Sequence, residues 1–222
     1  PKFSPDGKKV AFLSSRTGKN QIWIINTSGG EAKNITDEKK GVRSIKWSPD
    51  GKSISFLKND DDTENEIKSK ENKTDVILVD KNFKYSHIYT YSLVEDTVTQ
   101  ITKGNFSVNS YDYSPEGNKI VFSHQDDTNI NTGFVNSDIS VIESDGSNLK
   151  RLIKRPGIDS SPIFSGDKNK FAFISSGGKQ ESIGLRDVYI FNLKDNSIKK
   201  LSNTPNRDSN IISWSSDNKT LI

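Results

Sequence analysis

Few residues in this chain could act as nucleophiles or general bases. The 222 residues include two histidines, His87 and His124, and no cysteine. A serine hydrolase needs a G-x-S-x-G turn together with an acid and a histidine elsewhere in the chain. No G-x-S-x-G occurs, and the glycines and serines of "SSGGKQESIG" (175–184) are wrongly spaced. The sequence therefore offers no catalytic triad, no catalytic residue and no thiolate metal site.

The two histidines stand at the ends of apolar-polar alternations. His87 opens "HIYTY" and His124 comes near the end of "VFSHQ". Both segments have the period of a β-strand, so each histidine is expected at a strand end. We predict a structural or surface role for both, and not a catalytic one.

An acidic run, "NDDDTENE" (59–66), could suggest calcium through Asp60, Asp62 and Glu64. The EF-hand loop needs a glycine at its sixth position and a glutamate at its twelfth, and neither is in place. The segment 58–75 is instead predicted to be a solvated loop, because it is charged and nearly devoid of apolar residues; helical periodicity is absent throughout the chain. No metal and no cofactor are expected.

Five carboxylates recur in one five-residue phrase, which could indicate a ring of acidic ligands. The phrase is "FSPDG" at residue 3, "WSPDG" at 47, "YSPEG" at 113, "FSGDK" at 164 and "WSSDN" at 214, and its acids are Asp6, Asp50, Glu116, Asp167 and Asp217. Proline at the second position of a turn and glycine at its end favour a tight hairpin, and aspartate in such turns bonds nearby backbone N–H groups. Turn formation is therefore the preferred interpretation of these acids.

The elements around the phrase repeat with it. Alternating strands flank each copy, and a second hairpin follows at 21–36, 87–102, 138–153 and 187–202. Four-stranded antiparallel units that recur at about 40 to 50 residues are typical of β-propeller blades. The sequence predicts an all-β β-propeller domain over 1–222, with blades at 1–40, 41–106, 107–157 and 158–207 and a partial blade at 208–222.

Both ends of the chain supply the second strand of a blade, so they duplicate and do not complement each other. We therefore expect an open fragment of a larger propeller, in a parent protein that continues in both directions. The absence of an initiator methionine agrees with this expectation.

The pattern W/F-S-P-D-G-K followed by "QIWIINTSGGEAKNIT" resembles the TolB-type, WD40-like repeat. Two stretches, 1–36 and 74–102, resemble the N-terminal propeller of prolyl oligopeptidase-family serine peptidases, in the dipeptidyl-peptidase and acylaminoacyl-peptidase branches. This resemblance implies a C-terminal α/β-hydrolase domain in the parent chain and peptides as substrates. Dipeptidyl-peptidases hold the substrate amino terminus with paired glutamates, but Glu64 and Glu66 do not match that pattern.

Composition limits the partners. The chain has 32 Lys and Arg against 29 Asp and Glu, which is no clustered basic footprint, so nucleic-acid binding is not expected. No apolar run is long enough to span a membrane. The loops 124–138 and 175–187 are the predicted partner-facing surfaces, with Arg155 and Arg186 as the cations to test. The five N-x-S/T sequons, a common pattern in such a chain, indicate no site: Asn26, Asn34, Asn72, Asn105 and Asn218.

The sequence leaves three functions open. The first is a non-catalytic propeller that gates and positions peptides for a hydrolase domain of the parent protein. The second is a TolB-like protein-interaction propeller without enzymatic activity. The third, a propeller lyase, is disfavoured because two histidines are few for a ligand set in the central channel. The sequence leaves the compartment undecided between cytoplasmic and periplasmic or secreted.

Overall fold

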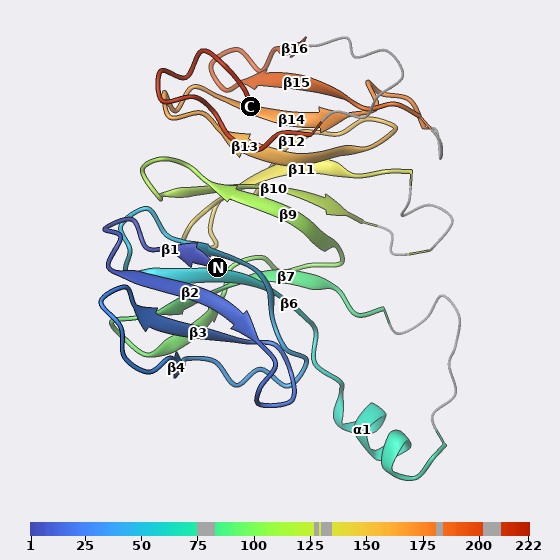
Figure 1. Ribbon diagram of the computed structural model, residues 1–222. Coiled ribbons are helices and arrows are strands. Elements are labelled where there is room, and N and C mark those ends of the chain that lie inside the picture. Colours follow the sequence, from blue (N-terminus) through green and yellow to red (C-terminus); the bar gives the residue numbers. More distant parts are fainter. Residues whose placement is uncertain (75–82, 127–128, 130–134, 181–183, 202–209) are drawn as a thin grey trace.

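The computed structural model describes residues 1–74, 83–126, 129, 135–180, 184–201 and 210–222 (Figure 1). Within these ranges the strands form four separate four-stranded antiparallel sheets, and in every sheet the strands are neighbours in chain order. The sheets follow one another as an open array (Figure 1). The predicted fold class, an all-β β-propeller array of four-stranded antiparallel blades, is confirmed.

Each sheet takes four consecutive strands. The first comprises β1 (Lys2–Phe3), β2 (Lys9–Ser14), β3 (Gln21–Asn26) and β4 (Lys33–Asn34). The second comprises β5 (Arg43–Trp47), β6 (Ser53–Asn59), β7 (Ser86–Ser92) and β8 (Thr97–Gln100). The third comprises β9 (Ser107–Tyr113), β10 (Lys119–Gln125), β11 (Asp138–Glu143) and β12 (Lys150–Ile153). The fourth comprises β13 (Asp159–Phe164), β14 (Lys170–Ser175), β15 (Asp187–Asn192) and β16 (Ile198–Lys200). Trp214, the first residue of the fifth copy of the phrase, forms an isolated antiparallel bridge with Leu221.

The recurring phrase forms the turn between the first and second strands of each sheet. In the first copy, Oδ1 of Asp6 accepts hydrogen bonds from the Ser4 hydroxyl at 2.6 Å and from the Lys8 amide at 3.0 Å. These bonds lower the pKa of Asp6. The same pair of bonds recurs at Asp50, Asp167 and Asp217. The aspartates are thus committed to local turn geometry, as the sequence predicted.

Glu116, the one glutamate in these turns, behaves differently. Its carboxylate pairs with Lys168 of the neighbouring sheet. In its own turn the Ser114 hydroxyl donates instead to Oδ1 of Asn118 at 2.9 Å. A longer acidic side chain therefore links two turns where aspartate would close one.

Apolar layers join each sheet to the next. The buried layer between the first two sheets includes Ile22, Ile54 and Phe56, and layers of the same kind lie between the second and third and the third and fourth sheets. The first strands lie at the inner edge of the array, where polar bonds connect them. Nζ of Lys46 in β5 lies 2.7 Å from Oδ1 of Asp112 in β9. The sequence folds this way because each strand alternates residues toward the two faces of its sheet.

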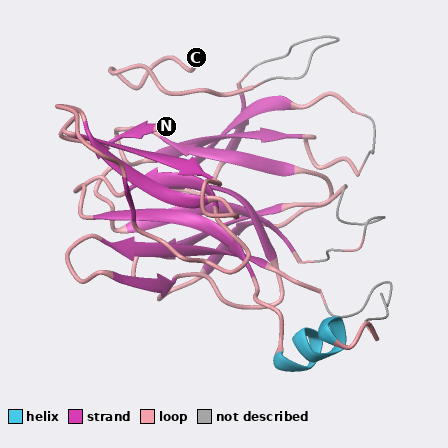
Figure 2. Ribbon diagram, turned by 60° about the horizontal axis from the view of Figure 1, so that its bottom comes forward, coloured by secondary structure: helices cyan, strands magenta, loops and turns pink. Residues whose placement is uncertain are grey.

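The segment predicted to be a solvated loop contains a short helix, and that prediction is wrong. Helix α1 (Glu64–Glu71) begins with a capping box, in which Thr63 caps the Glu66 amide and the Glu66 carboxylate accepts from the Thr63 amide at 2.7 Å. The helix has no buried residues and stands apart from the sheets (Figure 2). It carries no amphipathic signal because it packs no face against a core.

The array has two opposite faces. We call the face with the recurring turns the turn face. The opposite face, which carries the connections between second and third strands and the linkers between sheets, is the loop face; α1 lies on that side (Figure 1). In the part of the chain that is described, no helix has the length and apolarity needed to cross a membrane.

Candidate functional site

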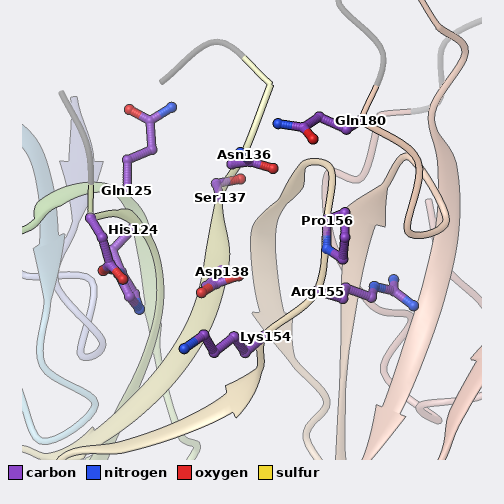
Figure 3. A pocket seen from close by; sticks show the side chains of 10 residues that line it. His124, Gln125, Asn136, Ser137, Asp138, Lys154, Arg155, Pro156 and Gln180 are labelled. Atoms are coloured by element: carbon purple, nitrogen blue, oxygen red, sulfur yellow. The ribbon is translucent and has the colours of Figure 1, made fainter. Parts of the chain in front are cut away.

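A cavity of about 570 Å³ opens on the loop face at the junction of the third and fourth sheets. Its lining comes from the end of β10, the start of β11, the linker after β12 and the loop after β14 (Figure 3). Both loops that the sequence singled out, 124–138 and 175–187, contribute described residues to this lining. The cavity lies where ligand-binding loops are expected on a rigid scaffold.

His124 forms one wall of the cavity because the third sheet lacks an aromatic pair. In the other sheets the equivalent phenylalanine of the second strand pairs across to Trp23, Tyr89 or Tyr189. In the third sheet Phe122 pairs with Ser140 instead. The His124 ring takes the vacated space: its centroid lies 5.5 Å from that of Phe122, and its Nε2 lies 2.8 Å from the Ser140 hydroxyl oxygen.

Two aspartates and an arginine flank this histidine. Oδ1 of Asp126 lies 3.2 Å from Nδ1 of His124, although in a geometry that leaves Nδ1 without a hydrogen bond. The Arg151 guanidinium bridges Asp126 at 2.7 Å and Asp138 at 3.0 Å. Desolvation, and then the charge of Arg151, lower the pKa of His124 to about 4. The imidazole is therefore neutral at pH 7.

The distances among Ser140, His124 and Asp126 resemble those of a catalytic triad, which sequence reasoning did not anticipate. Ser140 and His124 are each only 2% exposed, and Ser140 does not line the cavity. A nucleophile must reach the reacting carbonyl, and this hydroxyl is sealed beneath the imidazole. The three residues form a structural network and not an active site.

Arg155 lies at the opposite side of the cavity and is held in place. Its guanidinium donates to both carboxylate oxygens of Asp159, at 3.0 and 2.8 Å, and to the Ser175 hydroxyl at 2.7 Å. It also lies 5.4 Å from the ring centroid of Tyr189. Asp159 is 1% exposed, so this is a buried ion pair that fixes the linker. Lys154, by contrast, lines the cavity and has no carboxylate partner among the described residues.

The remaining candidates lie away from this cavity. His87 is buried, with Nδ1 3.3 Å from the Thr102 hydroxyl. Asp62 pairs with Lys40 and then Lys70, which lower its pKa to about 2. Glu66 forms an ion pair with Lys84 and accepts hydrogen bonds from the Thr63 amide and hydroxyl at the start of α1. Arg186 is half-buried in the loop before β15.

The acidic run does not form a metal centre in the described part of the chain. No group of three or more metal-ligating side chains gathers among those residues. The carboxylates of the run bind lysines and backbone amides instead, as Asp62 and Glu66 illustrate.

Part of the chain is similar to a known propeller family. The PD40 family, described as the TolB beta propeller domain, matches residues 1–85. Over 55 residues, 24% of this chain and 8% of the relative, the chain is 51% identical to the uncharacterized peptidase YuxL of Bacillus subtilis. Over 246 aligned residues, 100% of this chain and 36% of the relative, it is 21% identical to dipeptidyl-peptidase 5 of Porphyromonas gingivalis.

Among solved structures, the tricorn protease superposes with a TM-score of 0.68 at 12% identity, covering 99% of this chain and 23% of that protein. The chain covers well under two thirds of the length of each of these three proteins. The chain has a β-propeller fold and is similar in part to the TolB beta propeller domain, and the relatives that it resembles include peptidases.

Proposed function

We propose that this chain is the non-catalytic propeller segment of a prolyl oligopeptidase-family serine peptidase. In this role it would gate access to a hydrolase domain of the same polypeptide and position peptide substrates for that domain. The array would admit short or unfolded peptides and exclude folded proteins by its size. The chain itself would contribute binding and exclusion, and no bond-breaking group.

One observation carries this proposal: the similarity to dipeptidyl-peptidase 5 extends along the entire chain. The local match to the peptidase YuxL supports it. The triad-like distances at His124 do not offer an alternative chemistry, because the Ser140 hydroxyl is inaccessible. A rigid array with cavities on its loop face is well suited to contacting a peptide.

The test is to identify the full-length polypeptide that contains this sequence and label it with a fluorophosphonate. The proposal predicts one labelled serine, outside residues 1–222, within a G-x-S-x-G turn. Labelling would be expected to disappear when that serine is replaced by alanine. A full-length protein with no such turn and no labelling would contradict the proposal.

A second function is favoured by the family match itself, because the matched description is that of the TolB propeller. In that case the array would work through protein–protein contacts alone. Affinity capture with the full-length protein would then return a stoichiometric protein partner, and peptide hydrolysis would be absent. Hydrolysis by the same preparation would exclude this alternative.

A further inference from the structure

A second cavity, of about 390 Å³, occupies the corresponding place at the junction of the first and second sheets. Like the larger cavity, it lies on the loop face between a connection of second and third strands and a linker between sheets. Its cationic lining residues are Lys19, Lys40 and Arg43, and no aspartate or glutamate is among the described residues that line it. Asn20, Asn59 and Ser15 add neutral polar groups.

The two junctions differ in how their linker arginine is compensated; in strand register Arg43, paired with Leu57, corresponds to Ser160, paired with Ile174. Asp159 follows the linker glycine of the fourth sheet by two residues and neutralises Arg155. At the first junction the residue two places after the linker glycine is Arg43. Its Nη2 donates to the Ser86 hydroxyl at 2.7 Å, and no carboxylate of a described residue lies within ion-pair distance of it.

The carboxylates nearby are already engaged. Glu38, in the same linker, lies 2.7 Å from Nζ of Lys58. Asp62 is shared between Lys40, at 2.6 Å, and Lys70, at 2.7 Å. A second carboxylate on Lys58 comes from Asp61, at 3.1 Å. The positive charge of Arg43 is therefore left uncompensated by the described residues around it.

The guanidinium of Arg43 is also partly desolvated. The residue as a whole is exposed at the inner edge of the array, where it begins β5. Protein atoms nonetheless surround the guanidinium closely enough that desolvation lowers the pKa of Arg43. An anion bound at this position would offset that penalty, because an opposite charge stabilises the ionised form.

We propose that this cavity binds the carboxylate group of a peptide, with Arg43 as its main ligand and Lys19 as a supporting charge. A guanidinium offers paired N–H donors that match the two oxygens of a carboxylate. The volume accommodates a side chain or a chain terminus. That the carboxylate belongs to a peptide rests on the function proposed above, whereas preference for an anion follows from the lining alone.

Isothermal titration calorimetry on the 222-residue chain tests this site without a hydrolase domain. The ligands are Ac-Ala-Ala-Ala with a free carboxyl terminus, its carboxyl-terminal amide, Ac-Ala-Glu-Ala-NH₂ and Ac-Ala-Gln-Ala-NH₂. We expect the two peptides that carry a carboxylate to bind at least about tenfold more tightly than their neutral counterparts, and binding to weaken as salt screens the charges. The free-terminus peptide and the glutamate peptide separate the two sources of carboxylate.

Three variants locate the site. Arg43→Gln should lose the preference for carboxylates, and Arg43→Lys should retain only part of it because the paired donors are gone. Lys194→Gln removes the same charge on the turn face and should bind as the unaltered chain does. Circular dichroism melting confirms that each variant is folded.

Equal binding of charged and neutral peptides, or undiminished carboxylate binding by folded Arg43→Gln, would overturn the proposal. N-acetylglycine serves as a carboxylate with little peptide character. If it binds through Arg43 while the peptides do not, the anion site stands and the peptide role proposed for the propeller fails. If the full-length protein has peptidase activity but this cavity shows no preference for carboxylates, the proposed function stands and the proposed carboxylate site fails.

Discussion

The indole nitrogen of Trp47 donates a hydrogen bond to the backbone carbonyl oxygen of Lys2, 3.0 Å away in the preceding sheet. Trp214 makes the same bond at 3.1 Å to the carbonyl oxygen of Ile163. In both cases the tryptophan is the first residue of a copy of the recurring phrase. The acceptor belongs to the residue just before the first residue of the preceding copy, which is Phe3 or Phe164. One phrase therefore specifies both a turn and the contact between successive sheets.

Trp47→Phe should destabilise the chain because it removes this bond between sheets. Trp23→Phe is the matched control, since the buried Trp23 indole nitrogen has no hydrogen-bond partner among the residues that the structure describes. We expect Trp47→Phe to cost about 1 kcal/mol more in free energy of unfolding than the control. Urea unfolding followed by circular dichroism measures the difference. Equal costs would show that the bond contributes nothing.

Glycine in the recurring turn serves two purposes that can be separated. Gly7 and Gly117 both have positive φ, +69° and +75°. A Cβ on Gly117 would lie 3.2 Å from Cδ of Pro49 in the preceding turn, whereas a Cβ on Gly7 would meet nothing within 4 Å. Gly7→Ala should cost about 1 kcal/mol for the left-handed backbone alone. Gly117→Ala should cost more, and equal midpoints in urea would contradict this.

Stability should fall as the pH drops from about 6.5 to 4, because the folded chain binds a proton at His124 less readily than the unfolded chain. The pKa of His124 is about 4, against 6.5 in the unfolded state, so the unfolded state takes up more protons across this window. The loss attributable to His124 is about 3 kcal/mol when the full shift is realised.

Below about pH 4 this contribution stops changing. The pKa of His87 is also lowered, mainly by desolvation, so some slope should persist when His124 is replaced. His124→Gln should flatten the dependence between pH 4 and 6.5 in urea titrations. An unchanged slope in that variant would show that the imidazole is not buried in its neutral form.

The sealed network at Ser140 predicts chemical inertness. A fluorophosphonate should not label residues 1–222 on their own, because the Ser140 hydroxyl is buried and lies under His124. Intact-protein mass spectrometry measures the adduct directly. An adduct lost in Ser140→Ala would mean that this hydroxyl is accessible and that the chain has a nucleophile of its own.

The architecture could be predicted from the sequence because its determinants are local. Serine, proline, an acidic residue and glycine fix the first three turns within five residues, and the last two copies keep the serine and the aspartate; strand alternation fixes which side chains are buried. Helix α1 was missed because helical periodicity reports a buried face, which this helix lacks. The signal available was the pair Thr63 and Glu66, three residues apart, which forms a capping box.

The site could not be predicted in the same way because it depends on contacts between sheets. The position of His124 follows from a serine replacing an aromatic residue on the neighbouring strand, at Ser140. The charge of Arg43 is uncompensated because no carboxylate of a described residue lies within ion-pair distance of it. Neither relationship is visible until the strands are paired and the linkers are placed.

The most direct test of the account is the size selectivity of the full-length polypeptide. The rate constant kcat/KM should be measured for one cleavage sequence presented in a short peptide, in a long unfolded chain and in a loop of a folded protein. A propeller that gates a hydrolase domain should give efficient cleavage of the short peptide and no cleavage of the folded host. Comparable cleavage of all three, or of none, would contradict a propeller that gates a peptidase.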